Sequence, residues 1–117
     1  MFDFYQVSDL LSPEEREVQR AARRFLEAEA LPHIAKWWEE AEFPTHLIRR
    51  FGEMGFLGPS LPTEYGGLGA SAATYGVVSY ELERIDSGLR SFCSVQSSLV
   101  MYPIWAYGSE EQKRFYL

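Results

Sequence analysis

The stretch Leu61-Pro62-Thr63-Glu64-Tyr65-Gly66-Gly67-Leu68-Gly69 separates two helical halves of the chain. Pro59 and Pro62 forbid a helix interior, so residues 56–70 are expected to form a loop. Loops of this length are usually functional or disordered, and the leucines and the tyrosine argue for order. The glycines favour a tight turn with positive φ over a phosphate-binding loop, because no strand precedes them and no lysine–hydroxyl pair follows.

The second half of the chain predicts two helices joined by a sharp break. Ser71 is expected to cap a helix that runs to about Ile85, and Asp86-Ser87-Gly88 breaks this helix and offers a new cap. The next helix is expected from near Leu89 to about Val100, bent or ended by Pro103. The residues expected to form the buried stripe of the first of these helices are Tyr75, Val78, Leu82 and Ile85.

The first half opens on Ser12-Pro13-Glu14-Glu15, which predicts a helix N-terminus with a capping box and proline at the first position. This helix is expected to end or kink at Leu31-Pro32. The residues predicted to face the core are Val18, Ala21, Ala22, Phe25 and Leu26, and those predicted on the opposite face are Arg16, Arg20, Arg23, Arg24 and Glu27. Residues 33–42 indicate one or two further helical turns.

A second main helix is expected to start at Pro44 and stop at Gly55. Near the end, Ser109 is expected to cap a last helix, which reaches the apolar Phe115-Tyr116-Leu117 after barely two turns. We interpret this as a truncation point or a fragment of a longer protein. The whole pattern predicts a single all-α domain over residues 1–117, a helical bundle with no β-domain in this chain.

The charge and the cysteine content limit which partners and which cell compartment we expect for this protein. The net charge is -6, with no basic stripe, so neither nucleic acid nor a membrane is expected as a partner. Cys93 is the single cysteine, which fits a reducing compartment, with the cytoplasm as the default. Met1 to Leu11 lacks the features of a secretory signal.

The residues offer few candidates for catalysis. His33 and His46 lie far apart in the sequence with no cysteine nearby, so we expect structural or surface roles and no metal site. No pairing of a nucleophile with a base can be read from the sequence. No catalytic residue is therefore predicted in this chain.

Arg90 and Ser94 are the candidate binding residues. Their i, i+4 spacing would place a guanidinium and a hydroxyl on one helix face, where together they suit a carboxylate. The alternative is a surface ion pair of Arg90 with Asp86 or with an acidic residue of the preceding helix. The serines around this pair, which are Ser91, Ser94, Ser97 and Ser98, would either face inward and leave room for a ligand or form a solvent-facing strip.

Several motifs in order resemble the N-terminal domain of the flavin-dependent acyl-CoA dehydrogenases. These motifs are Phe51-Gly52-Glu53-Met54-Gly55-Phe56-Leu57-Gly58, Pro62 to Gly69, Tyr80 to Gly88 and Tyr107-Gly108-Ser109-Glu110-Glu111-Gln112-Lys113. The run from Arg90 to Met101 is similar to that of glutaryl-CoA dehydrogenases in particular. The resemblance spans residues 12–117 approximately.

The resemblance implies a longer enzyme with a middle β-domain, a second helical bundle, FAD held between them and a homotetrameric assembly. Such an enzyme would convert glutaryl-CoA to crotonyl-CoA and CO2 and pass electrons to an electron-transferring flavoprotein. The base would be a glutamate of the C-terminal bundle. Arg90 and Ser94 would grip the distal carboxylate of the substrate.

The resemblance also implies what this chain lacks. With no catalytic glutamate and almost none of the flavin site, the 117 residues alone are expected to bind no FAD and to be inactive. One alternative is a dehydrogenase for another short-chain acyl-CoA. Another is a stand-alone helical interaction module, whose loop and last helix would present an apolar surface to a partner protein.

Overall fold

Helix α1 (Pro13–Glu29) begins at the capping box that the sequence predicts. The Ser12 hydroxyl accepts a hydrogen bond from the Glu15 amide at 3.1 Å, and the Glu15 carboxylate accepts one from the Ser12 amide at 2.8 Å. These two bonds satisfy N–H groups that the first turn of a helix leaves without partners. The helix ends at Ala30, directly before Leu31-Pro32, as expected.

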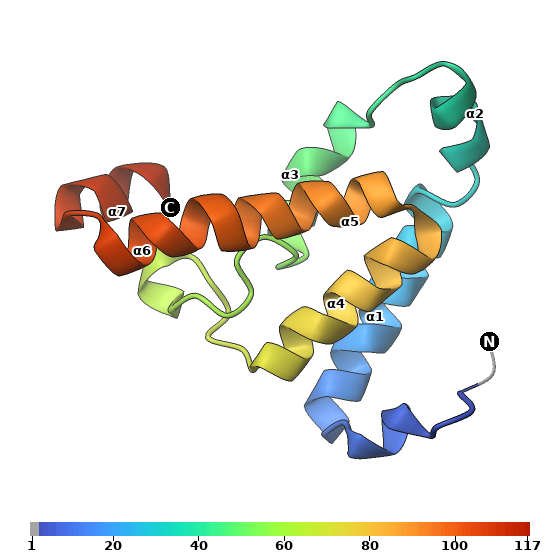
Figure 1. Cartoon of the computed structure of the whole chain (residues 1–117), viewed down its shortest axis with the longest axis horizontal. Coiled ribbons are helices and arrows are strands. Elements are labelled where there is room, and N and C mark those ends of the chain that lie inside the picture. The colour runs from blue at the N-terminus through green and yellow to red at the C-terminus, as the bar shows by residue number, and fades with distance from the viewer. Residues whose placement is uncertain (1–2) are drawn as a thin grey trace.

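The computed structural model describes residues 3–117, and within them every regular element is helical. The domain is flat, with extents of 43 × 39 × 19 Å (Figure 1). The fold class is therefore all-α, as the sequence predicts. The remaining elements are η1 (Val7–Leu10), α2 (Ile34–Glu39), η2 (Thr45–Leu47), α3 (Ile48–Glu53), η3 (Thr63–Tyr65), α4 (Ala72–Ile85), α5 (Ser87–Ser94), η4 (Val95–Met101), α6 (Tyr102–Tyr107) and α7 (Glu110–Tyr116).

Helix α2 ends in a turn that usually carries glycine. The amide of Ala41 donates to the Trp38 carbonyl and the amide of Glu42 donates to the Trp37 carbonyl, which is the Schellman pattern. The residue at the left-handed position is Ala41, with φ of 53°, where glycine would be unstrained. Helix α3 ends in the same way, but there Gly55, with φ of 74°, occupies the left-handed position.

The glycine-containing loop, residues 56–70, is held by hydrogen bonds within the loop and by a hydrogen bond to Ser97. The Gly69 amide donates to the Leu61 carbonyl, and a Cβ at Gly67 would collide with that same carbonyl. The Gly58 amide donates to the buried Ser97 hydroxyl at 2.9 Å. The loop is thus fixed to the second half of the chain by a hydrogen bond to Ser97.

Segments α5, η4 and α6 form one long continuous helix that crosses the molecule (Figure 1). The sequence predicts that this helix is bent or ended at Pro103, but it continues through the proline to Tyr107. The reason is local: η4 is a π-helical segment in which the Tyr102 amide donates to the Ser97 carbonyl, five residues back. Pro103 directly follows this wide turn, so the helix continues although proline donates no backbone hydrogen bond.

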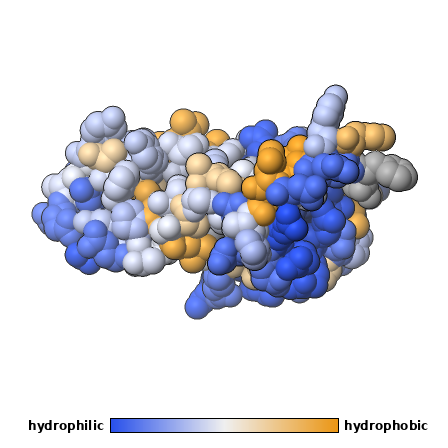
Figure 2. Space-filling view, turned by 90° about the horizontal axis from the view of Figure 1, so that it is seen from below, coloured by the Kyte–Doolittle hydropathy of each residue, from blue (hydrophilic) through white to orange (hydrophobic). Residues whose placement is uncertain are grey.

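The hydrophobic core lies between α1, α3, α4 and α5. Phe25, Phe51 and Phe56 pack on one another with ring centroids 5.8 to 6.3 Å apart. On α4, Val78 and Leu82 are buried as predicted, whereas Tyr75 and Ile85 are only half-buried. Figure 2 shows apolar surface in the middle of the lower face, between more hydrophilic ends.

A buried carboxylate joins α1 to α4. The Glu81 side chain is fully buried and accepts hydrogen bonds from two nitrogens of Arg23, Nε at 3.1 Å and Nη2 at 2.8 Å. Further bonds come from Arg84 Nε at 3.0 Å and from the Gln19 amide at 3.1 Å. The sequence places Arg23 and Glu27 on the face away from the core. Instead Arg23 binds Glu81 and Glu27 accepts a hydrogen bond from Arg84, so both point toward α4.

Burial alone would raise the pKa of Glu81, but the hydrogen bonds from Arg23 and Arg84 outweigh it and hold the pKa below its ordinary value of 4.5. The bonds to the Glu81 carboxylate therefore stabilise the fold fully above pH 4.5. This contribution is lost as the pH falls from there through the lowered pKa, where the carboxylate takes up a proton.

We expect Glu81→Gln to lower the free energy of unfolding at neutral pH by about 2–4 kcal/mol, because two arginines lose their charged partner. The loss of stability as the pH falls below 4.5 should be smaller in this variant than in the native chain, because an amide takes up no proton. Urea unfolding at several pH values measures both effects. Glu39→Gln, at an exposed position, is the matched control. An unchanged stability in Glu81→Gln would contradict this account.

The positive φ of Ala41 in the turn after α2 leads to a second prediction. Ala41→Gly should raise the free energy of unfolding by about 0.5–1 kcal/mol, because it removes the left-handed strain at a smaller cost in chain entropy. Gly55→Ala should do the reverse, since its Cβ would lie 2.5 Å from Leu68 Cδ1. Chemical denaturation of both variants tests this expectation. A loss of stability in Ala41→Gly would refute it.

Candidate substrate-binding site

The candidate site forms at the corner between α4 and α5. Asp86 has an extended backbone that ends α4, and its carboxylate accepts a hydrogen bond from the Leu89 amide at 2.9 Å. This is the break and new cap that the sequence predicts. The corner turns the chain so that the last turn of α4 and the first turns of α5 lie side by side.

Arg90 lies in this corner on α5 with its side chain 38% exposed. Its Nε donates to the Glu83 carboxylate of α4 at 2.7 Å, and its NH1 donates to the Ser94 hydroxyl at 3.1 Å. The structure therefore brings Arg90 and Ser94 together, as the i, i+4 spacing predicts. It also shows the expected alternative, an ion pair with an acidic residue of the preceding helix, and that residue is Glu83, not Asp86.

Glu83 is fixed by two partners. Arg90 donates to one of its oxygens and the Ser87 hydroxyl donates to the other, and both bonds lower the pKa of the Glu83 carboxyl, Arg90 the more strongly. Glu83 is thus ionised at neutral pH and pairs with the guanidinium. The sequence indicates an acidic partner on this helix but not which one, because the choice depends on the angle at the corner.

The serines of this helix do not share one environment. Ser97 is buried, where it donates to the Cys93 carbonyl at 2.7 Å and accepts from Gly58. Ser91 and Ser98 are exposed, and Ser94 is half-buried. The sequence left open whether these serines face inward or form a solvent-facing strip, and neither arrangement holds for all of them. Ser97 faces inward and binds the loop at Gly58, whereas Ser91 and Ser98 face solvent.

The arrangement at Arg90 suits an anion. A guanidinium has five N–H donors, and two of them bond Glu83 and Ser94, which leaves three without a hydrogen bond inside residues 3–117. The Ser94 hydroxyl currently donates to the Ser91 carbonyl at 3.2 Å and can rotate. Together they can donate to a carboxylate that approaches from the exposed side.

The other titratable residues singled out by the sequence lie elsewhere. The rings of His33 and His46 each contact Trp37, at centroid distances of 5.6 and 5.9 Å. No group of three or more potential metal ligands occurs in residues 3–117. Cys93 is buried, and burial raises the pKa of its thiol to about 12, so it stays protonated at neutral pH.

FAD needs cationic or N–H donors for its two phosphates and a slot for the flavin ring. Two surface hollows formed by residues 3–117, one beside α2 and one between α6 and α7, have no lysine or arginine in their lining. These hollows do not fit the cofactor.

No helix in the part of the chain that the structure describes could cross a membrane.

Residues 12–117 match the family model described as acyl-CoA dehydrogenase, N-terminal domain. The short/branched chain specific acyl-CoA dehydrogenase of Bos taurus, named as mitochondrial, is 32% identical over 104 residues, which are 89% of this chain and 24% of that protein.

Two similar solved structures are glutaryl-CoA dehydrogenases from Mycobacterium smegmatis. One, in complex with FADH2, is 41% identical with a TM-score of 0.93, covering 97% of this chain and 29% of that chain. The other is 46% identical with a TM-score of 0.89, covering 95% and 29%. The present chain thus spans 24–29% of the length of these three proteins.

Proposed function

Because the chain belongs to the acyl-CoA dehydrogenase family and carries its N-terminal helical domain, we propose that it forms one wall of the substrate pocket of a glutaryl-CoA dehydrogenase. The observation that carries this proposal is the Arg90–Ser94 pair, held together on one face of α5 with guanidinium donors to spare. The likeness to two glutaryl-CoA dehydrogenase structures supports it.

In this proposal Arg90 and Ser94 bind the distal carboxylate of glutaryl-CoA. A carboxylate in a closed acyl pocket is costly unless charged donors replace the water it loses. Charge-assisted hydrogen bonds contribute about 1.5–3 kcal/mol each, which is enough to select a dicarboxylic acyl chain over an uncharged one. Glu83 acts as a positioning residue, since its bond to Nε fixes the plane of the guanidinium.

We propose that the dehydrogenation and decarboxylation steps use parts of the complete protein other than these 117 residues. We propose that the complete protein dehydrogenates and decarboxylates glutaryl-CoA to crotonyl-CoA and CO2, with FAD as the redox cofactor. Its catalytic base would lie in another domain. From the same family membership we propose a homotetramer that passes electrons to an electron-transferring flavoprotein.

One observation favours a second candidate function. The ion pair between Arg90 and Glu83 is also what a purely structural arginine would form at the α4–α5 corner. In that case the complete enzyme would oxidise another short-chain acyl-CoA. The stand-alone interaction module, the third possibility, would use exposed side chains such as Phe115, which is 80% exposed on α7.

Substitution of Arg90 in the complete protein separates the first two functions. We expect Arg90→Ala to lower kcat/KM for glutaryl-CoA by about 10- to 100-fold more than for butyryl-CoA, because only glutaryl-CoA has a distal carboxylate to lose its donors. Steady-state kinetics with both substrates provides the measurement.

Arg49→Ala is the matched control, since Arg49 forms an exposed ion pair with Glu53 on α3. It should leave both values unchanged. An equal loss for the two substrates in Arg90→Ala would show that Arg90 is structural and would favour the second candidate.

The 117-residue chain purified alone should contain no flavin and should not oxidise glutaryl-CoA. The physical reason is that the hollows beside α2 and between α6 and α7 have no lysine or arginine in their lining to hold the cofactor phosphates. Absorbance in the flavin bands after gel filtration with added FAD measures retention. Retained FAD at a stoichiometry near one would contradict the expectation.

A further inference from the structure

Trp38, on α2, is an exposed tryptophan that is bonded to the corner between α4 and α5. The residue is 72% exposed, whereas the preceding Trp37 is buried. The Trp38 indole Nε1 donates a hydrogen bond to the Asp86 carboxylate at 2.6 Å, across 48 residues of sequence. Burial of apolar surface contributes little at so exposed a position. The hydrogen bond to Asp86 is therefore the main structural contact of this side chain.

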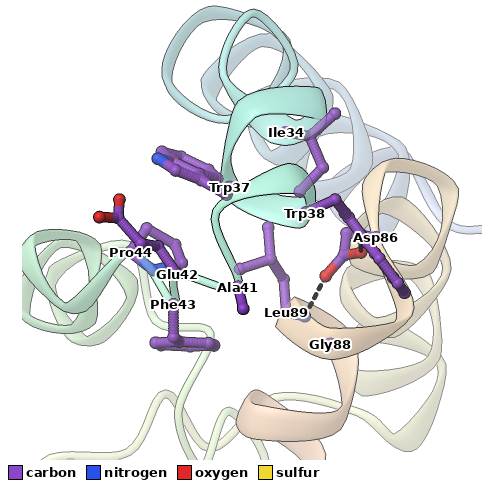
Figure 3. Close-up of a pocket in the computed structure, with 10 residues that line it drawn as sticks. All are labelled: Ile34, Trp37, Trp38, Ala41, Glu42, Phe43, Pro44, Asp86, Gly88 and Leu89. Atoms are coloured by element: carbon purple, nitrogen blue, oxygen red, sulfur yellow. Dashed lines mark hydrogen bonds between the residues drawn. The ribbon is translucent and has the colours of Figure 1, made fainter.

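The Asp86 carboxylate has a donor for each of its oxygens. Oδ1 accepts the bond from Trp38, and Oδ2 accepts the bond from the Leu89 amide that caps α5 (Figure 3). The space beside it is filled as well, because a Cβ at Gly88 would lie 2.7 Å from Oδ2. A carboxylate bonded at both oxygens rotates less freely than one bonded only by its helix cap. The first turn of α5 is thus fixed to α2.

The same corner determines where Arg90 lies relative to its partner. The Arg90 amide donates to the Asp86 carbonyl at 3.2 Å, which is a backbone bond in the first turn of α5. The next residue, Ser87, donates through its hydroxyl to the Glu83 carboxylate, and Glu83 accepts the Arg90 Nε at 2.7 Å. A shift of the corner would therefore change the position of the guanidinium.

Helix α2 is itself anchored to the core. Trp37 is buried in the hydrophobic core with Leu47 and Phe51, and its ring contacts the ring of His46 at a centroid distance of 5.9 Å. Because Trp38 is the next residue along the chain, it can hold the corner against a fixed element. Without its indole N–H, only α4 and α5 themselves would determine the geometry of the corner.

We propose that Trp38 is a positioning residue for the substrate site. Its hydrogen bond to Asp86 fixes the corner and so the direction in which the Arg90 guanidinium meets the distal carboxylate of the acyl chain. Hydrogen bonds weaken steeply with poor alignment, and a displacement of about 1 Å can cost a large factor in rate. This inference rests on the proposed binding role of Arg90 and Ser94.

The test is Trp38→Phe in the complete protein, which keeps an aromatic ring and removes the donor. We expect kcat/KM for glutaryl-CoA to fall about three- to tenfold more than kcat/KM for butyryl-CoA, because only glutaryl-CoA uses the aligned guanidinium. Steady-state kinetics with both substrates gives this ratio. Trp105→Phe makes the same chemical change on α6 and is the matched control, which should leave the ratio unchanged.

The double variant Trp38→Phe/Arg90→Ala shows whether Trp38 acts through Arg90. In the Arg90→Ala background, Trp38→Phe should not change the ratio further, because no guanidinium remains to be positioned. A further fall in the ratio would overturn the inference, since Trp38 would then act by another route.

Two other outcomes would also contradict the positioning role, and they differ in what else they exclude. If Arg90→Ala changes the ratio but Trp38→Phe lowers both kcat/KM values equally or not at all, Trp38 is only structural and the proposed function stands. If Arg90→Ala leaves the ratio unchanged, the proposed function itself fails, and the role of Trp38 fails with it.

Discussion

The buried Glu81 carboxylate is the interaction on which the rest of the domain depends. A charge without access to water is tolerated only when it is fully paired, and here Gln19 and Arg23 of α1 and Arg84 of α4 together provide the donors. Because these donors come from both helices, the bonds fix how α1 and α4 lie against each other. Hydrophobic packing alone would allow many similar arrangements.

The position of α4 in turn decides where the candidate site forms. Asp86 ends α4 and caps α5, and the resulting corner brings Glu83 beside Arg90. The Ser97 hydroxyl then ties the long helix to the glycine-containing loop through Gly58. The same corner holds Trp38, whose indole N–H donates to the Asp86 carboxylate.

Local signals in the sequence were sufficient for most of the fold. The capping residues Ser12, Ser71 and Asp86 each accept the backbone hydrogen bond that their position predicts. The burial of Glu81 and its pairing with Arg23 could not be predicted, because these bonds form only when two helices that are distant in the sequence meet. For the site, the i, i+4 pairing of Arg90 with Ser94 was confirmed, but its role in binding a substrate stays a prediction. The continuation of the helix through Pro103 depends on a wide turn that no residue pattern marks.

The central claim is that Arg90 and Ser94 bind the distal carboxylate of an acyl-CoA. The most direct measurement is a crystal structure of the complete protein with glutaryl-CoA bound. This account predicts the distal carboxylate within hydrogen-bond distance of the Arg90 guanidinium and the Ser94 hydroxyl. A carboxylate bound elsewhere, with Arg90 still paired only to Glu83 and Ser94, would contradict it.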